Sequence, residues 1–344
     1  MRLGALLGLL AALSFGISAP LAKLLLAEVP AQLLAGLLYL GAGLGLTVLK
    51  VVRPGTREAP LTRGDGPPLL GVIVLGGVAG PLLLLVGLGR VSGAAGALLL
   101  NLEAPLTILL AALLFGEHLG RRAALASLCI LLGALVLRVG PGALVLDELG
   151  AGAIAGACLC WALDNNLTQR LSLKDPFQVV RIKTLAAGAF NCALALGLGA
   201  SLPRASVLAL ALVLGLVSYG VSVVLDAYAL RLHGAAREAA YFATAPFVGA
   251  LAAVPLLGES LGAPELAAMT LMVAGVVLLL RERHSHVHVH EPHAHAHLHV
   301  HDEHHQHEHG SGDPTGEPHA HMHRHAHLVH EHPHVPDLHH RHEH

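Results

Sequence analysis

Long apolar segments alternate with short polar ones over the first 283 residues of the chain. A membrane-spanning helix needs about 20 apolar residues, because each residue rises about 1.5 Å through roughly 30 Å of hydrocarbon. The pattern predicts an all-α integral membrane protein with ten transmembrane helices. The expected spans are Leu3–Leu26, Pro30–Val52, Pro68–Leu88, Val91–Phe115, Arg122–Val139, Leu149–Leu171, Pro176–Leu198, Val207–Leu230, Ala235–Leu257 and Ala263–Leu280.

Five spans precede a Gly-Pro-Gly junction at residues 140–142 and five follow it, and the two halves share a repeated stretch. A repeat this long indicates a duplicated half-protein rather than a solenoid unit. With five spans per half, the second half inserts upside down relative to the first, which is the inverted-repeat plan of secondary transporters. The shared positions are Gly93-Ala94-Ala95 with Gly234-Ala235-Ala236, Ala104-Pro105 with Ala245-Pro246, Gly116-Glu117 with Gly258-Glu259, and Gly133 with Gly275.

Composition and charge agree with a bilayer protein. The chain is 54% hydrophobic and 13% charged, whereas a soluble domain carries about 25% charged residues. With both termini placed in the cytoplasm, thirteen Lys and Arg residues of the bundle lie on the cytoplasmic side and four on the outer side. Because positive residues favour the inner side, we expect a multi-pass protein of the cell (inner) membrane with both termini cytoplasmic.

Polar and ionisable side chains inside the spans are candidates for a substrate pathway. A charge at mid-membrane costs roughly 2.5–3.5 kcal/mol on insertion scales, so such residues face protein or water and mark functional sites by default. Tyr219, Ser222 and Asp226 are spaced i, i+3 and i+7, which predicts a single polar stripe on the eighth span. The full set is Glu103, Asp164, Asn165, Asn166, Lys183, Tyr219, Ser222 and Asp226.

The same residues have a structural alternative. Asp164 and Asp226 could hold the bundle together through interhelical hydrogen bonds, but such bonds average only about 0.6 kcal/mol, which favours a site. Lys183 could neutralise either acid. Glu103 is either a polar group beside a central cavity or a neutral acid hydrogen-bonded between helices. Pro105 permits either a hinge or a fixed bend.

The sequence offers no other chemistry for the bundle. It has no phosphate-binding loop and no Cys-x-x-Cys pair, and its aspartates lack the sequence context of an intramembrane aspartyl protease. We therefore expect no enzyme activity, no cofactor in the bundle and no nucleic-acid partner. The expected partners are the lipid bilayer and a small-molecule or metal-ion substrate, and a homodimer remains open.

Residues 284–344 form a tail that holds 25 of the 27 histidines. The tail has no aromatic residues and too few apolar ones for a core, so we expect it to be disordered. An affinity tag is the simplest alternative, but the irregular spacing over about 60 residues argues against one. Neutral imidazole suits Zn²⁺, Ni²⁺, Co²⁺ and Cu²⁺, so we expect divalent metal binding without a defined preference. The candidate ligands are His284, His286, His288, His290, His293, His295, His297, His299, His301, His304, His305, His307, His309, His319, His321, His323, His325 and His327.

The two five-span halves, each closing with an Ala-Pro…Gly-Glu helix pair, resemble the EamA-type transporters of the drug/metabolite transporter superfamily. Residues 161–168 and residues 234–242 resemble a bacterial branch of it. The resemblance covers residues 1–283 and implies a ten-helix carrier that works by alternating access, usually exporting small metabolites or amino acids. It divides the chain into two five-helix EamA-like repeats, 1–140 and 148–283, and the disordered His-rich cytoplasmic tail, 284–344, which the family does not generally carry.

Two functions remain open on the sequence. The first is a secondary transporter that exports either a small organic metabolite or a divalent metal gathered by the tail. The second is a membrane-tethered metal buffer or sensor that does not transport. The polar residues inside the spans favour a working pathway. No span has His, Cys and Asp residues at metal-ligand spacing, which favours an organic substrate for the pore, while the tail favours a metal.

Overall fold

The structure is a computed structural model, and it describes most of the bundle and four segments of the tail. The described residues are 2–52, 61–115, 120–137, 147–168, 171, 174–233, 241–281, 284–290, 293–299, 319–325 and 328–334.

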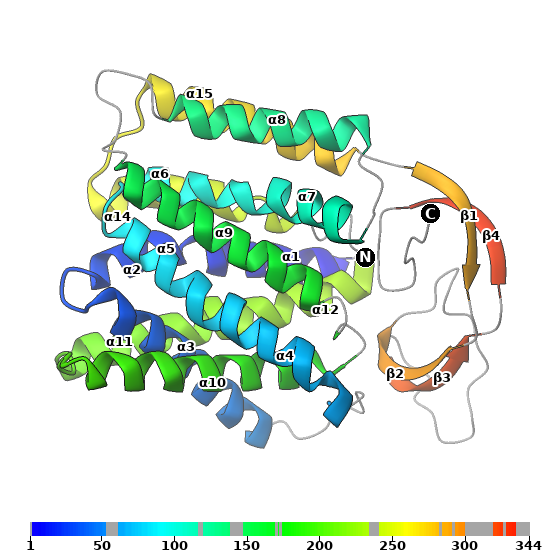
Figure 1. The fold of residues 1–344 in the computed structure, drawn as a ribbon, viewed down its shortest axis with the longest axis horizontal. Helices are drawn as coiled ribbons and strands as arrows, with labels where there is room; N and C mark the ends of the chain where they lie inside the picture. The colour runs from blue at the N-terminus through cyan, green and yellow to red at the C-terminus, as the bar shows by residue number, and fades with distance from the viewer. Residues whose placement is uncertain are drawn as a thin grey trace.

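Helices make up most of the described chain up to residue 281, and they lie side by side in one bundle (Figure 1). The 3-10 turns η1 (Arg63–Asp65) and η3 (Leu100–Leu102) and the π-helical segments η2 (Ile73–Ala79) and η5 (Leu216–Val221) join several of them into longer rods. The helices are α1 (Arg2–Gly16), α2 (Ser18–Leu25), α3 (Ala31–Val52), α4 (Gly66–Val72), α5 (Gly80–Leu88), α6 (Gly93–Leu99), α7 (Glu103–Phe115), α8 (Arg121–Val136), α9 (Glu148–Thr168), α10 (Pro176–Gly197), α11 (Ala205–Gly215), α12 (Ser222–His233), α14 (Ala245–Leu257) and α15 (Ala263–Leu280).

Seven helical stretches of the described residues are long and apolar enough to cross a membrane. The other three expected spans coincide with α8, α9 and α14, which are helical but are not among the seven. α8 has 16 residues and α14 has 13, and the positions expected to extend them, 138–139 and 235–240, lie outside the described residues. The seven are Leu3–Leu25, Ala31–Val51, Arg63–Leu88, Gly93–Leu113, Pro176–Gly197, Ala205–Ala229 and Ala263–Leu280.

The repeated prolines begin helical segments rather than bend the middle of one. Pro105 stands in the first turn of α7, directly after the 3-10 turn η3, and Pro246 stands in the first turn of α14. A proline costs little there because the first backbone N–H groups of a helix have no intrahelical partner. Each repeated proline therefore lies at the start of a helical segment.

Glycines let the central helices approach one another closely. A Cβ placed on Gly188 of α10 would lie 2.4 Å from the backbone nitrogen of Leu40 in α3. A Cβ on Gly215 of α11 would lie 1.9 Å from the carbonyl oxygen of Leu38. Because lipid supplies no hydrophobic force between helices, contacts of this kind hold a membrane bundle together through packing. They account for part of the high glycine content, 39 residues.

The pairing of α8 with α15 repeats one contact in both directions. A Cβ on Gly133 of α8 would lie 3.0 Å from the carbonyl oxygen of Ala268, and a Cβ on Gly275 of α15 would lie 2.7 Å from that of Ala126. In each case the second-half residue is 142 positions after its first-half counterpart. Equivalent residues of the two halves thus pack against each other reciprocally.

The second copy of the Gly-Glu motif closes the start of α6. The Glu259 carboxylate accepts hydrogen bonds of 2.6 and 2.8 Å from the backbone N–H groups of Gly93 and Ala94. Ser92 Oγ accepts a third from Ala95, at 3.1 Å. Backbone donors at a helix start otherwise remain unpaired, and a carboxylate there also meets the positive end of the helix dipole. Two parts of the repeated sequence, one from each half, therefore meet at this point. The counterpart residues, Glu117 and Gly234-Ala235, lie outside the described residues.

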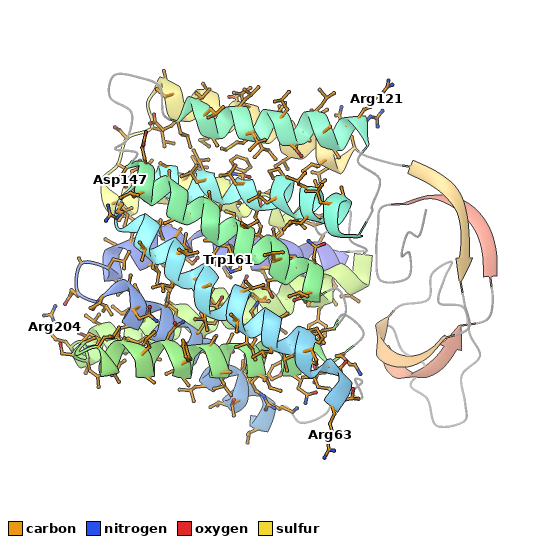
Figure 2. The ribbon with its side chains drawn as sticks, in the orientation of Figure 1. Arg63, Arg121, Asp147, Trp161 and Arg204 are labelled. Carbon is orange, nitrogen blue, oxygen red and sulfur yellow. The ribbon has the colours of Figure 1, made fainter. Side chains whose placement is uncertain are left out.

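Four polar residues define the two ends of the bundle. Arg63 and Arg121 lie at one end, and Asp147 and Arg204 lie at the other (Figure 2). At the latter end Asp147 caps α9, since its Oδ1 accepts a 2.9 Å hydrogen bond from the Gly150 N–H. That hydrogen bond and the Arg90 guanidinium hold the pKa of the Asp147 carboxyl below its usual value. The N-terminus and the tail lie at the end that carries Arg63 and Arg121 (Figure 1).

The tail differs from the expected disordered segment in the four stretches that are described. β1 (His284–His290) pairs with β4 (Leu328–His334), and β2 (His293–His299) pairs with β3 (His319–His325), both antiparallel. The physical reason is the alternation of histidine with another residue, because a period of two matches the pleat of a strand. The candidate ligands outside the described residues are His301, His304, His305, His307, His309 and His327.

Replacing Glu259 with alanine should destabilise the bundle, because it leaves two backbone donors at the start of α6 unpaired. We expect a loss of about 1–3 kcal/mol, measured as a lower unfolding temperature in detergent. Glu28→Ala is the control, because Glu28 pairs with Arg204 at an exposed site, and exposed ion pairs contribute about 1 kcal/mol or less. Equal effects of the two substitutions would contradict the capping role of Glu259.

Candidate functional site

A π-helical segment interrupts the third span, and a proline explains it. At the end of η2 the N–H of Gly80 donates to the carbonyl of Leu75, five residues earlier instead of four. The Gly76 carbonyl would then need the N–H of residue 81, which is a proline and has none. This carbonyl is left without a backbone donor in the bundle interior, where an unpaired carbonyl costs free energy.

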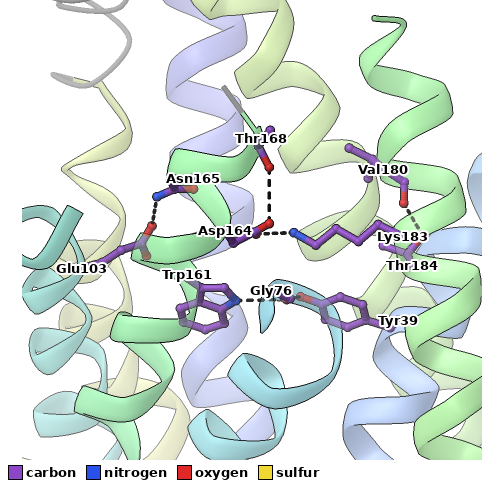
Figure 3. Close-up of polar contacts among 10 residues, drawn as sticks. All are labelled: Tyr39, Gly76, Glu103, Trp161, Asp164, Asn165, Thr168, Val180, Lys183 and Thr184. Atoms are coloured by element: carbon purple, nitrogen blue, oxygen red, sulfur yellow. Dashed lines mark hydrogen bonds and ion pairs between the residues drawn. The ribbon is translucent and has the colours of Figure 1, made fainter. Parts of the chain in front are cut away.

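Two aromatic side chains from other helices supply the missing donors. The Tyr39 hydroxyl of α3 donates to the Gly76 carbonyl at 2.8 Å, and Trp161 Nε1 of α9 donates to it at 3.2 Å (Figure 3). Both aromatic residues are buried. The carbonyl therefore fastens the third span to α3 and α9 at a single point.

An ion pair between Asp164 and Lys183 lies beside this carbonyl (Figure 3). The two side chains are 7% and 16% exposed, and Thr168 Oγ1 donates a 3.3 Å hydrogen bond to the second carboxylate oxygen of Asp164. A Cβ on Gly76 would lie 2.0 Å from Asp164 Oδ2 and 2.7 Å from Lys183 Nζ. Glycine at position 76 thus makes room for the ion pair. Of the two acids that Lys183 could neutralise, it pairs with Asp164.

Glu103 extends the polar cluster toward α7. Its carboxylate accepts a 2.7 Å hydrogen bond from Asn165 Nδ2, so it is bonded between α7 and α9. Of the two alternatives for Glu103, the structure shows a hydrogen bond between helices, made with the neighbour of Asp164 in the sequence.

A second π-helical segment, η5, interrupts the eighth span. Tyr219 of η5 donates a 3.4 Å hydrogen bond to Ser18 Oγ, and its ring lies 5.8 Å from that of Phe15 and 5.6 Å from that of Tyr39, between centroids. Trp161 and Asp164, which contact η2, stand 146 positions after Phe15 and Ser18, which contact η5. The first helix of each half therefore packs on the π-helical segment of the other half.

The expected stripe of Tyr219, Ser222 and Asp226 begins in η5 and continues into α12. Tyr219 and Ser222 both bond to residues of the first span. Ser222 is fully buried and donates to the carbonyl of Ala11 at 2.9 Å, which fastens α12 to α1. Asp226 is half-buried on α12.

The remaining polar candidate, Asn166, points toward α7. Its Nδ2 donates to the carbonyl of Ala162 at 2.8 Å and to that of Thr107 at 3.5 Å. The structure therefore gathers Glu103, Asp164, Asn165 and Lys183 into one cluster. It uses Asn166 and Ser222 for contacts between helices.

Sequence reasoning missed three residues of this cluster, Tyr39, Gly76 and Trp161. Two signals could have found them. Gly80-Pro81 inside an apolar span predicts a local break in the helical hydrogen bonds. Trp161 is the only tryptophan of the chain, and a buried tryptophan needs an acceptor for its N–H.

Comparison with known proteins decides the family. The model of the EamA-like transporter family matches residues 2–139 and, a second time, residues 148–281. The chain belongs to the EamA-like transporter family. It is therefore a multi-pass membrane transporter and not an enzyme.

One curated relative and one solved structure are similar to this chain. An uncharacterized transporter from Methanothermobacter thermautotrophicus is 31% identical over 287 residues, which are 78% of this chain and 83% of that protein. A crystal structure of a protein with 22% sequence identity superposes with a TM-score of 0.61, over 81% of this chain and 98% of the other. The solved structure bears on the fold alone.

Gly76→Ala should disrupt the centre of this EamA-like bundle, because the added methyl group occupies the place of the Asp164–Lys183 pair. We expect a loss of about 1–3 kcal/mol from overpacking, measured by thermal unfolding in detergent. Gly152→Ala on α9 is the control, because a Cβ there meets nothing within 4 Å. Unfolding of Gly76→Ala at the wild-type temperature would contradict the close packing described here.

Proposed function

We propose that this EamA-like protein is a secondary carrier that exports a small organic metabolite by alternating access, with the Asp164–Lys183 cluster on its substrate pathway. Residues 1–140 and 148–283 form two inverted five-helix halves, which together span the membrane ten times. The observation that carries the proposal is the buried ion pair of the second half, seated on the Gly76 carbonyl of the first half.

The position of the ion pair is what favours a pathway. Asp164 and Lys183 belong to α9 and α10, while Gly76 belongs to the third span, so the pair lies where the two halves meet. Secondary carriers built from inverted repeats bind their substrate between the repeats and move one against the other. The double family match and the reciprocal packing of α8 and α15 support two such halves.

The chemistry of the cluster favours an organic substrate over a metal ion. The Asp164 carboxylate is occupied by an ammonium group, and a second cation beside Lys183 would be repelled. Asn165, Thr168 and Trp161 add amide, hydroxyl and indole groups that hydrogen-bond to organic molecules. The substrate we propose carries charged or hydrogen-bonding groups that compete with this ion pair.

The orientation follows from the two ends of the bundle. The end with Arg63 and Arg121 faces the cytoplasm, together with both termini, because cytoplasmic segments of membrane proteins are enriched in Lys and Arg. The tail then lies in the cytoplasm, where most of its imidazoles are neutral near pH 7 and able to bind divalent Ni, Co, Zn or Cu. A membrane-tethered metal buffer or sensor without transport is the second candidate, and the 25 histidines of the tail favour it.

The orientation predicts the behaviour of fused reporters. A reporter enzyme that works only in the cytoplasm should be active when fused after residue 283 and inactive when inserted near Ala143. A reporter enzyme that works only outside the cytoplasm should show the opposite pattern. Activity of both reporters on the same side would contradict an inverted arrangement, because the two positions are separated by five spans.

Neutralising the Asp164–Lys183 ion pair should distinguish its contribution to protein stability from its role in transport. Asp164→Asn or Lys183→Gln alone leaves an uncompensated buried charge, which costs about 3–5 kcal/mol. The double variant Asp164→Asn/Lys183→Gln removes both charges, so the protein should regain its stability and its level in the membrane. If the pair belongs to the pathway, transport should remain absent in the double variant.

The measurement is growth of cells that overproduce each variant, across toxic amino acids, amino-acid analogues and Ni²⁺, Co²⁺, Zn²⁺ and Cu²⁺ salts. Wild-type protein should raise tolerance to an organic class, and the double variant should not. A chain ending at residue 283 should keep that tolerance and change only the response to metals. Full transport by the double variant would assign the ion pair to stability alone. If the wild-type protein raises tolerance to metals alone, and the chain ending at residue 283 loses that tolerance, the membrane-tethered metal buffer is favoured instead.

A further inference from the structure

Histidines stand directly opposite one another in both ribbons of the tail. In the β2–β3 ribbon all four histidines of one strand face histidines of the other, in an unbroken register. In the β1–β4 ribbon three such pairs occur, and His290 stands opposite Leu328. We call each cross-strand pair a rung. The seven rungs are 293–325, 295–323, 297–321, 299–319, 284–334, 286–332 and 288–330.

The register places the rungs of each ribbon on one face. Alternate residues of a strand share a face, and all the histidines of a strand are separated by two positions. The other face of the β2–β3 ribbon carries the residues between them, among them Ala296 and Met322. A shift of the register by one residue would put each histidine opposite one of these residues instead, so the pairing depends on the register and not on composition.

The spacing of a rung suits a shared metal ion. Directly opposite residues of an antiparallel pair have Cβ atoms about 4.5–5.5 Å apart, and diagonal neighbours are about 7–8 Å apart. A metal ion that bonds two imidazole nitrogens at about 2.0–2.1 Å keeps those nitrogens within about 4 Å of each other. A rung therefore matches one metal ion more closely than a diagonal pair does.

We propose that the metal sites of the tail are cross-strand histidine rungs of the two ribbons, and that each takes a divalent late first-row transition metal such as Ni²⁺ or Zn²⁺. The inference rests on the proposed metal-binding tail and specifies how it binds. Sequential His-x-His pairs on a flexible chain would bind in any register. Rungs bind only when strands separated by about 20 to 50 residues are paired correctly.

Metal binding and strand pairing then support each other. An isolated two-stranded ribbon is at best marginally stable in water, and alternating small residues specify its register weakly. A metal ion bound across a rung stabilises only the register that forms the rung. Because a metal bound only by the folded form shifts the equilibrium toward it, added metal should slow backbone amide exchange in all four strands.

Two variants of the full-length protein separate rungs from flexible pairs, and each replaces four histidines with asparagine. The rung-keeping variant is His295→Asn/His297→Asn/His321→Asn/His323→Asn, which leaves rungs 293–325 and 299–319 whole. The rung-breaking variant is His293→Asn/His297→Asn/His319→Asn/His323→Asn, which leaves one histidine in each rung. Neither variant keeps a His-x-His pair within β2 or β3, and both leave the β1–β4 ribbon unchanged.

The proteins are purified in detergent without a polyhistidine tag and titrated with NiCl₂ or ZnCl₂ by calorimetry at pH 7.5, with amide exchange measured alongside. The rung-keeping variant should retain about two metal ions more per molecule than the rung-breaking variant, since each of its two whole rungs offers two imidazoles to one ion. Added metal should slow exchange in β2 and β3 of the rung-keeping variant only.

Three other results would contradict a specific part of the proposal. Equal binding by the two variants, with both below wild type, would overturn the rungs and leave a flexible metal-binding tail. Binding by both at the wild-type level would remove the β2–β3 ribbon from the sites. A wild-type protein that binds no more metal than a chain ending at residue 283 would overturn the metal role of the tail itself. A matching unfolding temperature of the bundle in both variants confirms that folding is unchanged.

Discussion

The Gly76 carbonyl is the contact on which the centre of the bundle depends. In a bilayer a backbone group cannot turn to water, so a carbonyl that loses its helical donor must find another one inside the protein. Pro81 removes that donor, and Tyr39 and Trp161 replace it from two other helices. The replacement fixes the rotation of α3 and α9 about their axes, and Asp164 on α9 is thereby held against the third span.

The ion pair follows from that geometry. A lone carboxylate at this depth would be costly, and Lys183 on α10 compensates it within a space that only glycine at position 76 leaves open. A buried ion pair is weak evidence for stability, because desolvation offsets most of the attraction between its charges. Its place between the halves of an EamA-like transporter is the reason we propose that a substrate exchanges with it.

The ends of the bundle use another kind of contact. Glu259 pairs two donors at the start of α6, and Lys23 Nζ donates to the carbonyls of Leu88 and Val91, at 2.6 and 2.5 Å, on the preceding turn. The short connection between α5 and α6 is thus held on both sides by charged groups from other helices. The carboxylate lies at the N–H groups that begin α6 and the ammonium at carbonyls at and just after the end of α5, as the helix dipole favours.

The sequence by itself determined the membrane class, the family and the residues that carry charge in the spans. These predictions rest on local sequence, namely the length of the apolar segments, the repeated Gly-Glu and Ala-Pro motifs and the distribution of Lys and Arg. They do not depend on which residues are in contact in the folded protein. The alternation of histidine in the tail is local in the same way. The same alternation is typical of a β-strand, and the prediction of a disordered tail gave this too little weight.

Only the tertiary structure decided which polar residues meet. The sequence left both Asp164 and Asp226 as possible partners of Lys183. The choice of Asp164 depends on how α10 packs against α9. The spacing of Tyr219, Ser222 and Asp226 predicted one stripe, but it could not show that the hydroxyls of Tyr219 and Ser222 are bonded to residues of the first span. The register that sets histidine opposite histidine is likewise a property of two strands together, because no single strand specifies its partner.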